Sequence, residues 1–199
     1  MKEKIIETSL QQFLAHGIRD ITMQKLVLTL GISTKTMYKY FKDKEELLEE
    51  CLKVHYKESD NGILHIINGS PNVVASIWRV YSKVIDLDFG INLLFYHDLN
   101  YYYPDLQDKV IKQYSKGAFE TLTGIIELGI HEGYFLACLE SPVVLETLTI
   151  LYTSVTRYNA YKEFGMKHEL IKHTIAIYLR GICTDKGLRV MNQLKELSH

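Results

Sequence analysis

Proline and cysteine are both scarce, with three of each among 199 residues. So few prolines leave long stretches without a helix breaker, and the many Leu, Ile, Lys and Glu residues favour helices. The cysteines lie far apart, at Cys51, Cys138 and Cys183, and an odd number without a C-x-x-C pair argues against a zinc site or a disulfide framework. We therefore expect buried free thiols, no metal site and no cofactor.

Long apolar runs are missing too. No stretch reaches the roughly 18 apolar residues of a membrane span, and the N-terminal MKEKIIE lacks the apolar core of a signal peptide. Phosphate-binding glycine loops, H-E-x-x-H and G-x-S-x-G motifs do not occur, so nothing supports an enzyme built on a helical bundle. A non-enzymatic cytoplasmic protein without membrane contact is expected.

Charge is spread unevenly along the chain. Residues 1–44 hold eight basic and four acidic residues, a net charge of +4, whereas residues 45–199 hold 15 basic and 20 acidic residues, a net charge of -5. A basic N-terminal segment suggests a polyanionic partner for that segment alone. An ordinary solvated surface remains the alternative, because the excess is modest.

Capping residues predict three short helices before residue 42. An amphipathic first helix ends at Gly17. Thr22 is a favourable N-cap for a second helix that Gly31 terminates, and Ser33 is placed to cap a third helix two residues later. Two short helices joined by a tight glycine-containing turn form a helix-turn-helix, here over about residues 22–41.

The third helix has two chemically different faces on a helical wheel. With Met37 and Phe41 toward the core, lysines project from the opposite side and hydroxyl groups flank them. The lysines are Lys35, Lys39 and Lys42, and the flanking residues are Thr36 and Tyr38. Such a face suits a DNA groove, where cations meet phosphates or base edges. A lysine-rich solvated surface is the alternative interpretation.

A fourth helix is predicted to begin directly after this face. Asp43 and Glu46 have the spacing of an N-cap and its capping-box partner. Lys44 lies at the same terminus, where a cation and free backbone N–H groups could hold one phosphate together.

The stretch TMQKLVLTLGISTKTMYKYFKDKEEL resembles the DNA-binding domain of the TetR family of bacterial transcriptional regulators, over residues 2–50. The most specific matches are Gly31, Ile32, Ser33, Tyr38, Phe41, Lys44, Glu45 and Leu47. The resemblance implies phosphate contacts by Tyr38 and Lys44, and a base-proximal position for Thr34, Lys35, Thr36 and Lys39. The sequence departs from the family pattern at Val27 and Leu30, where many members have alanine, and at Lys35, where many have glycine.

The predicted DNA-binding set combines the helix-turn-helix with these implied contacts. It comprises Thr22, Gln24, Lys25, Ser33, Thr34, Lys35, Thr36, Tyr38, Lys39, Tyr40, Lys42 and Lys44. We expect a DNA-binding domain over residues 1–55 and a helical regulatory and dimerisation domain over 56–199. The fold class is all-α, with about nine or ten helices.

The later helices are predicted from periodicity and breakers. Ser70 and Pro71 are expected to open a fifth helix that a turn at 86–90 ends. Continuous helices are expected over about 105–131 and 167–183, and a short last helix over 188–197.

An eighth helix is expected from Ser141 to Tyr161, with Glu146 and Arg157 as its only charged residues. A helix so poor in charge is covered on most sides. The resemblance implies that this helix and the next pair across a two-fold axis. The predicted dimer residues are Leu148, Tyr152, Val155, Ile171, Ile175 and Tyr178. An intramolecular core is the alternative, since periodicity does not separate core from interface.

Aromatic residues cluster between the fifth and seventh predicted helices. The resemblance implies a small-molecule effector bound inside the bundle, and aromatic walls with hydroxyl groups suit an apolar or flat ligand. The predicted pocket residues are Trp78, Tyr81, Phe95, Tyr96, Asn100, Tyr101, Tyr114 and Tyr152. Simple core packing is the alternative for each of them.

These patterns favour a ligand-responsive repressor that binds a palindromic double-stranded DNA operator as a homodimer. The alternative is a helical interaction or carrier module in which the basic N-terminal segment is incidental.

Overall fold

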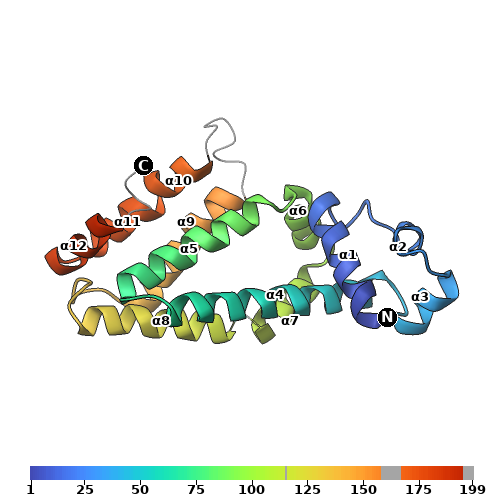
Figure 1. Cartoon of the computed structure of the whole chain (residues 1–199), viewed down its shortest axis with the longest axis horizontal. Helices are drawn as coiled ribbons and strands as arrows, with labels where there is room; N and C mark the ends of the chain where they lie inside the picture. Colours follow the sequence, from blue (N-terminus) through green and yellow to red (C-terminus); the bar gives the residue numbers. More distant parts are fainter. Residues whose placement is uncertain (115, 158–166, 195–199) are drawn as a thin grey trace. The chain divides into compact units, whose positions relative to one another are not determined.

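The computed structural model describes residues 1–114, 116–157 and 167–194 (Figure 1). Helices make up its regular structure, and the strand-like pairing within these residues is a single isolated antiparallel bridge between Phe135 and Cys183. The all-α prediction is therefore confirmed. None of the described helices has both the length and the apolar character needed to cross a membrane.

Residue contacts divide the chain into two compact units. The head unit comprises Met1–Asp60 and Gly90–Lys116, and the body unit comprises Asn61–Phe89 and Gly117–His199. The division falls within a helix, at residue 60. Residues 90–116 are predicted from the sequence to belong to the regulatory domain, whereas their contacts group them with the helix-turn-helix.

The head unit contains the three N-terminal helices, the first part of a fourth helix and two helices from its second segment. They are α1 (Lys2–His16), α2 (Met23–Leu30), α3 (Thr34–Tyr40), the first part of α4 (Lys44–Asn68), α6 (Leu93–Tyr102) and α7 (Pro104–Tyr114). One apolar cluster holds them together. Its fully buried members include Phe13 of α1, Leu26 of α2, Met37 of α3, Leu48 of α4 and Phe95 of α6.

The body unit is organised around α5 (Val73–Phe89), which is buried over most of its length. The other helices are α8 (Lys116–His131), α9 (Ser141–Thr156), α10 (Lys167–His173), α11 (Ile175–Ile182) and α12 (Asp185–Gln193). Helix α5 contacts α9 and α12, and α11 contacts α9. Their buried side chains form a second apolar cluster, which includes Ile77, Leu148 and Leu179.

The start of α5 differs from the expectation. The helix begins at Val73, because the side chain of Asn72 accepts a hydrogen bond from the Ala75 N–H at 2.9 Å. Ser70 instead donates its hydroxyl to the Ile66 carbonyl at 2.7 Å, in the last turn of α4. The predicted turn at 86–90 is also wrong, since α5 continues to Phe89.

Two long predicted helices correspond to pairs of segments. Helices α7 and α8 flank residue 115, which lies outside the described residues, so the continuity expected over 105–131 stays a prediction. The helix expected over 167–183 is interrupted at Thr174, which separates α10 from α11. The parts of the eighth and last predicted helices at 158–161 and 195–197 also lie outside the described residues.

The three cysteines are free, but not all are buried. Cys51 and Cys183 lie in the interior, where burial raises the pKa of the Cys183 thiol to about 11. Cys138 is exposed, so the expectation of a buried thiol is wrong for that residue, which lies between helices rather than on an apolar face.

Candidate nucleic-acid interface

The helix-turn-helix is fixed by local capping. Thr22 accepts the Lys25 N–H at its side-chain oxygen, 3.1 Å away, and Ser33 accepts the Thr36 N–H at 3.0 Å. Between them Gly31 ends α2 in the left-handed conformation, with φ 64° and ψ 32°, where a side chain would introduce strain. The predicted capping roles of Thr22, Gly31 and Ser33 are therefore confirmed. They end α2 at Leu30 and start α3 at Thr34, so a short turn joins the two helices.

Helix α3 separates its residues as the wheel predicts. Met37 is 0% exposed and Phe41 is 1% exposed, both within the head core. The side chains of Lys35 and Lys39 are exposed, and Tyr38 is 52% exposed. Thr34 is exposed at the first position of the helix. The surface formed by these four residues is called the α3 face below.

The α3 face has no internal partners within the described part of the chain. Its lysines form no ion pair with a described residue, and the Tyr38 hydroxyl and Thr34 side chain form no hydrogen bond there. Their charges and donors are therefore available to an external group. The ammonium of Lys42, just beyond the helix, makes an exposed contact with the Asp43 carboxylate at 3.9 Å.

Several other predicted DNA-binding residues are engaged inside the head. The hydroxyls of Ser33 and Thr36 lie 2.8 Å apart and hydrogen-bond each other. Lys25 donates its ammonium to the Asp20 carbonyl at 2.8 Å. Gln24 is exposed and Tyr40 is half-buried. The structure thus brings the predicted residues of α2 and α3 together on one unit, with the α3 face as their most available part.

Lys44 is directed inward. Its ammonium donates to the Ile18 carbonyl, lies 3.5 Å from the Arg19 carbonyl and is 5.8 Å from the centre of the Phe13 ring. Burial lowers the pKa of this half-buried lysine, and the nearby carboxylates of Asp98 and Asp20 oppose that shift. The sequence assigns this ammonium to a phosphate, whereas the structure engages it with the loop between α1 and α2.

The first turn of α4 is closed by two carboxylates. Asp43 accepts the Glu46 N–H at 2.8 Å, as a capping residue does. Glu46 reaches back to the Lys42 N–H at 2.7 Å, one residue before the N-cap. The arrangement is therefore a variant of the predicted capping box.

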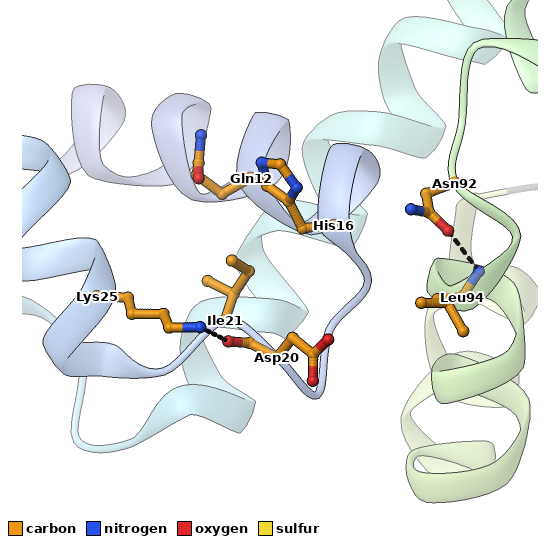
Figure 2. Close-up of a pocket in the computed structure, with 7 residues that line it drawn as sticks. All are labelled: Gln12, His16, Asp20, Ile21, Lys25, Asn92 and Leu94. Carbon is orange, nitrogen blue, oxygen red and sulfur yellow. Dashed lines mark hydrogen bonds between the residues drawn. The ribbon is translucent and has the colours of Figure 1, made fainter.

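A cleft of about 480 Å³ opens beside the same loop (Figure 2). It is lined by Gln12, His16, Asp20, Ile21, Lys25, Asn92 and Leu94, from α1, the loop, α2 and the start of α6. Figure 2 shows the Lys25 side chain directed to the Asp20 backbone, and Asn92 capping α6 through the Leu94 N–H. The part of α6 that borders this cleft was not singled out by sequence.

The predicted pocket residues are divided between the two units. Trp78, Tyr81 and Tyr152 belong to the body, and the other five belong to the head. Of the latter, Phe95 and Tyr96 are buried in the head core, Tyr101 is 72% exposed and Asn100 is exposed. Tyr114 lies on α7.

The body contains a buried polar network that sequence reasoning missed. The Tyr152 hydroxyl donates to the carboxylate of Asp88, which is 7% exposed. Arg157 donates to the Tyr152 hydroxyl at 3.2 Å, and its Nε lies 3.5 Å from Asp88. Burial, and secondarily the Asp88 charge, raises the pKa of Tyr152. The sequence carries two acids, Asp86 and Asp88, at the end of α5, but it predicts a turn there rather than a buried carboxylate.

Two further polar atoms are buried on α5. The Trp78 indole nitrogen and the Ser82 hydroxyl have no hydrogen-bond partner among the described residues. Tyr81, between them, packs edge-on against Tyr152, with ring centres 6.3 Å apart. Buried donors without partners are rare and call for an explanation. No three described His, Cys, Asp or Glu side chains converge in a way that could hold a metal ion.

Four predicted dimer residues occupy the body core. Leu148 and Ile175 are 0% exposed, and Val155 and Ile171 are also buried. Tyr152 and Tyr178 are half-buried, Tyr152 in the network described above. These four side chains therefore lie in the intramolecular core, which is the alternative that the sequence left open.

The chain is similar to known proteins in sequence near its N-terminus and in fold. Residues 5–51 match the family model described as bacterial regulatory proteins, tetR family. No curated protein matches the chain in sequence. Solved structures match in fold over almost the whole chain.

The fatty acid degradation regulator FadR from Bacillus halodurans shares 16% identity with a TM-score of 0.71, covering 91% of this chain and 94% of that one. FadR from Bacillus subtilis, solved in complex with stearoyl-CoA, shares 18% identity with a TM-score of 0.72, covering 92% and 98%. A TetR-family regulator from Cytophaga hutchinsonii shares 15% identity with a TM-score of 0.77, covering 93% and 96%. At these identities the likeness shows the fold.

A capped helix-turn-helix with a cationic, unpartnered recognition helix defines a DNA-binding transcriptional regulator. The family-model match shows that residues 5–51 are similar to the corresponding region of tetR-family bacterial regulatory proteins, and the chain as a whole shares the fold of solved TetR-family regulators. Those relatives are transcriptional regulators rather than enzymes.

Proposed function

We propose that the protein is a ligand-responsive repressor that binds a partly palindromic operator as a homodimer. The observation that carries the proposal is the α3 face, where Lys35 and Lys39 are exposed beside Tyr38 without internal partners. A helix bearing such a face enters the major groove of DNA. A dimer then reads two half-sites whose centres are about 34–36 Å, or a multiple of that, apart.

Each residue of the α3 face has a distinct proposed contact. Lys35 and Lys39 lie one helical turn apart, so both can reach base edges or the flanking phosphates. Tyr38 presents its hydroxyl at the margin, which suits a phosphate oxygen. Thr34, at the first turn, is placed to contact a base edge. Gln24 of α2, Tyr40 and Lys42 extend the contact toward the DNA backbone.

The dimer surface is proposed on the outer sides of α9 and α11. Val143, Ile150 and Ile177 are 62%, 57% and 59% exposed, although all three are large and apolar. Val143 and Ile150 are seven residues apart, so they share one stripe of α9. Helix α11 packs against α9 and carries Ile177. Exposed apolar side chains on two adjacent helices suit a second copy of the same chain.

The effector is proposed to bind in the body beside α5. Trp78 and Ser82 offer unpartnered polar atoms one helical turn apart, and Asp88, Tyr152 and Arg157 supply a charged network. An apolar or aromatic compound with a hydrogen-bond acceptor fits these groups. An effector that prefers a conformation unable to hold both half-sites lowers DNA affinity by its differential binding energy, typically ~1–3 kcal/mol.

The DNA-binding proposal is tested by sequencing the duplexes that the full-length protein retains from a random pool. Recovered sites should contain inverted half-sites, and binding should weaken steeply with salt because counterions are released. A carrier module with an incidental basic segment would retain no common sequence and show only a shallow salt dependence. A reporter gene placed downstream of the recovered site should be repressed.

The effector proposal is tested with a compound panel and Trp78 fluorescence. The panel contains fatty acids, aromatic acids and stearoyl-CoA, which the Bacillus subtilis relative binds. An effector should change the emission of Trp78, the only tryptophan, and release DNA over the same concentration range. Compounds that release DNA only by competing at the head would contradict the proposal.

A further inference from the structure

Residues 33–36, the cap and first turn of α3, carry four polar side chains. The Ser33 hydroxyl accepts the Thr36 N–H at 3.0 Å and lies 2.8 Å from the Thr36 hydroxyl, so these two side chains engage each other. Thr34 and Lys35 are exposed and make no hydrogen bond or ion pair within the described part of the chain. Thr34 and Lys35 are therefore the side chains of this turn that are available to a base edge.

Lys35 points almost directly away from the head core. It lies two residues before Met37, which is 0% exposed, and two residues rotate a helix by about 200°. Lys39, two residues after Met37, also points outward, but it is the sixth residue of α3 whereas Lys35 is the second. Recognition helices contact base edges with their N-terminal residues. Lys35 is therefore placed for a base, and Lys39 for a flanking phosphate.

The chemistry of the Lys35 ammonium favours one base. A lysine ammonium donates hydrogen bonds and accepts none. In the major groove guanine presents two acceptors, N7 and O6, whereas adenine presents an acceptor and a donor, thymine an acceptor beside a methyl group, and cytosine a donor. A group that only donates is therefore matched best by guanine. The Thr34 hydroxyl both donates and accepts, so it does not separate the bases in this way.

We infer that Lys35 is a specificity-determining residue, which reads one guanine in each half-site of the operator through N7 and O6. This rests on the proposed DNA-binding function and deepens it, because it names a base that the bound DNA must contain. The family resemblance implies only that this position lies near bases, and many members have glycine there. Glycine has no side chain to read a base, so the guanine contact depends on a residue particular to this chain.

A phosphate contact is the competing role for Lys35. Phosphate contacts are already offered by Tyr38 at the margin of the α3 face and by Lys39 and Lys42 farther along, all three of which are exposed. The two roles differ in one measurable respect. A contact to a phosphate strengthens binding to every sequence alike, whereas a contact to a base edge discriminates between sequences.

Selection from a random duplex pool, repeated with full-length variants, separates the two roles. The wild-type protein should recover half-sites with one invariant guanine, and Lys35→Ala should recover sites in which that position is no longer fixed. Lys35→Gln should prefer adenine there, because a glutamine amide donates to N7 and accepts from N6 of that base. Lys39→Gln is the matched control, one helical turn away, and should still select the guanine.

Affinities for one selected duplex give the size of the effect. Replacing the guanine by adenine should weaken wild-type binding by on the order of ten-fold for each half-site. The same replacement should have little effect on Lys35→Ala. Lys39→Gln should bind both duplexes more weakly by one common factor, and its slope of log affinity against log salt should be smaller by about one.

A modified base tests the acceptor atom itself. 7-Deazaguanine still pairs with cytosine, but it has a C–H group in place of N7. At the selected position it should weaken wild-type binding several-fold and leave Lys35→Ala unaffected, which is the coupling expected of two groups in contact. Lys35 is exposed, so its variants should fold like the wild type. A thermal melt checks this, and either Lys35→Ala or Lys35→Gln keeps the test if the other does not fold.

The possible failures are distinguishable. A protein that retains no common sequence would overturn the proposed DNA-binding function and the role of Lys35 together. The role of Lys35 alone would be overturned by selected half-sites without an invariant guanine, by a guanine that Lys35→Ala still requires, or by wild-type binding that is insensitive to 7-deazaguanine.

Discussion

The head and the body place their polar side chains in opposite environments. On the α3 face of the head, Lys35 and Lys39 are exposed and have no partner within the described residues. In the body, the buried carboxylate of Asp88 contacts the half-buried side chains of Tyr152 and Arg157. The lysines of the α3 face are therefore available to a polyanion, whereas the charged groups of the body contact one another inside the protein.

The same contrast recurs on a smaller scale within each unit. Lys39 and Lys44 lie close in sequence, yet one is exposed and the other donates to Ile18. On α9, Leu148 and Ile150 are two residues apart, yet one is 0% exposed and the other 57%. Residue type does not distinguish the members of either pair, so substitutions at each pair test the comparison directly.

The largest expected effect is at Leu148. Leu148→Asp places a carboxylate in the body core, which should lower the free energy of unfolding by on the order of 4 kcal/mol. Ile150→Asp places the same group on the outer stripe and should give a folded monomer. Denaturant unfolding followed by Trp78 fluorescence and analytical ultracentrifugation measure the two outcomes.

Identical or reversed effects of Leu148→Asp and Ile150→Asp on stability and oligomeric state would contradict the contrast between the two α9 residues. A stable dimer carrying Ile150→Asp would remove the proposed dimer surface. A Leu148→Asp protein with the unfolding free energy of the wild type would contradict the assignment of that residue to the core. Ile177→Asp on α11 provides an independent repeat of the surface substitution.

A smaller effect is expected in the polar network. Tyr152→Phe removes the hydroxyl that links Asp88 to Arg157 and should cost about 1–3 kcal/mol of unfolding free energy, because a buried acceptor loses its donor. Ligand-free DNA affinity should stay near the wild-type value, since the α3 face is untouched. A filter-binding assay beside a thermal melt checks both, and a large loss of DNA affinity would show that the network also supports the head.

On the α3 face, Tyr38→Phe should weaken DNA binding by on the order of 1 kcal/mol through one lost hydroxyl. Lys39→Ala should also reduce the salt slope by about one if Lys39 meets a phosphate. Thermal stability should change little, because exposed residues without partners contribute within about 0.5 kcal/mol. The exposed Lys83 of α5 provides the matched control, and Lys83→Ala should leave DNA binding unchanged.

The sequence is most informative where structure depends on neighbours along the chain. Thr22, Gly31 and Ser33 act on backbone groups within three residues, so their capping roles follow from local patterns. The division of α3 into a buried and a cationic face follows from the 100° rotation per residue in the same way. These features made the helix-turn-helix and its family recognisable.

Long-range pairing accounts for what the sequence does not reveal. Helix α9 is apolar on both sides, so periodicity alone does not show that Leu148 faces the core and Ile150 faces outward. Asp88 pairs with Tyr152, 64 residues later, and Asp98 with Arg19, 79 residues earlier. No local pattern encodes either partner, which is why α6 was not expected to belong with the head.

The smallest predicted effect is at the head surface, where an ion-pair cluster joins α4 to α7. Glu49 contacts Lys53 and Lys109, each at 2.8 Å, and hydrogen bonds first from Lys109 and then from Lys53 hold the pKa of its carboxyl below the ordinary value of 4.5. A carboxyl whose pKa is lower in the folded state stabilises the protein above its unfolded-state pKa. That contribution is lost as the pH falls through the lower folded-state value.

Glu49→Gln should therefore reduce the unfolding free energy at neutral pH by only about 0.5 kcal/mol, because solvent screens exposed pairs. The difference from wild type should shrink with added salt and vanish in acid. A difference that grows as the pH falls would show that Glu49 is stabilised by its protonated form instead, which would place it with the buried polar groups of the body rather than with the solvated charges of the head.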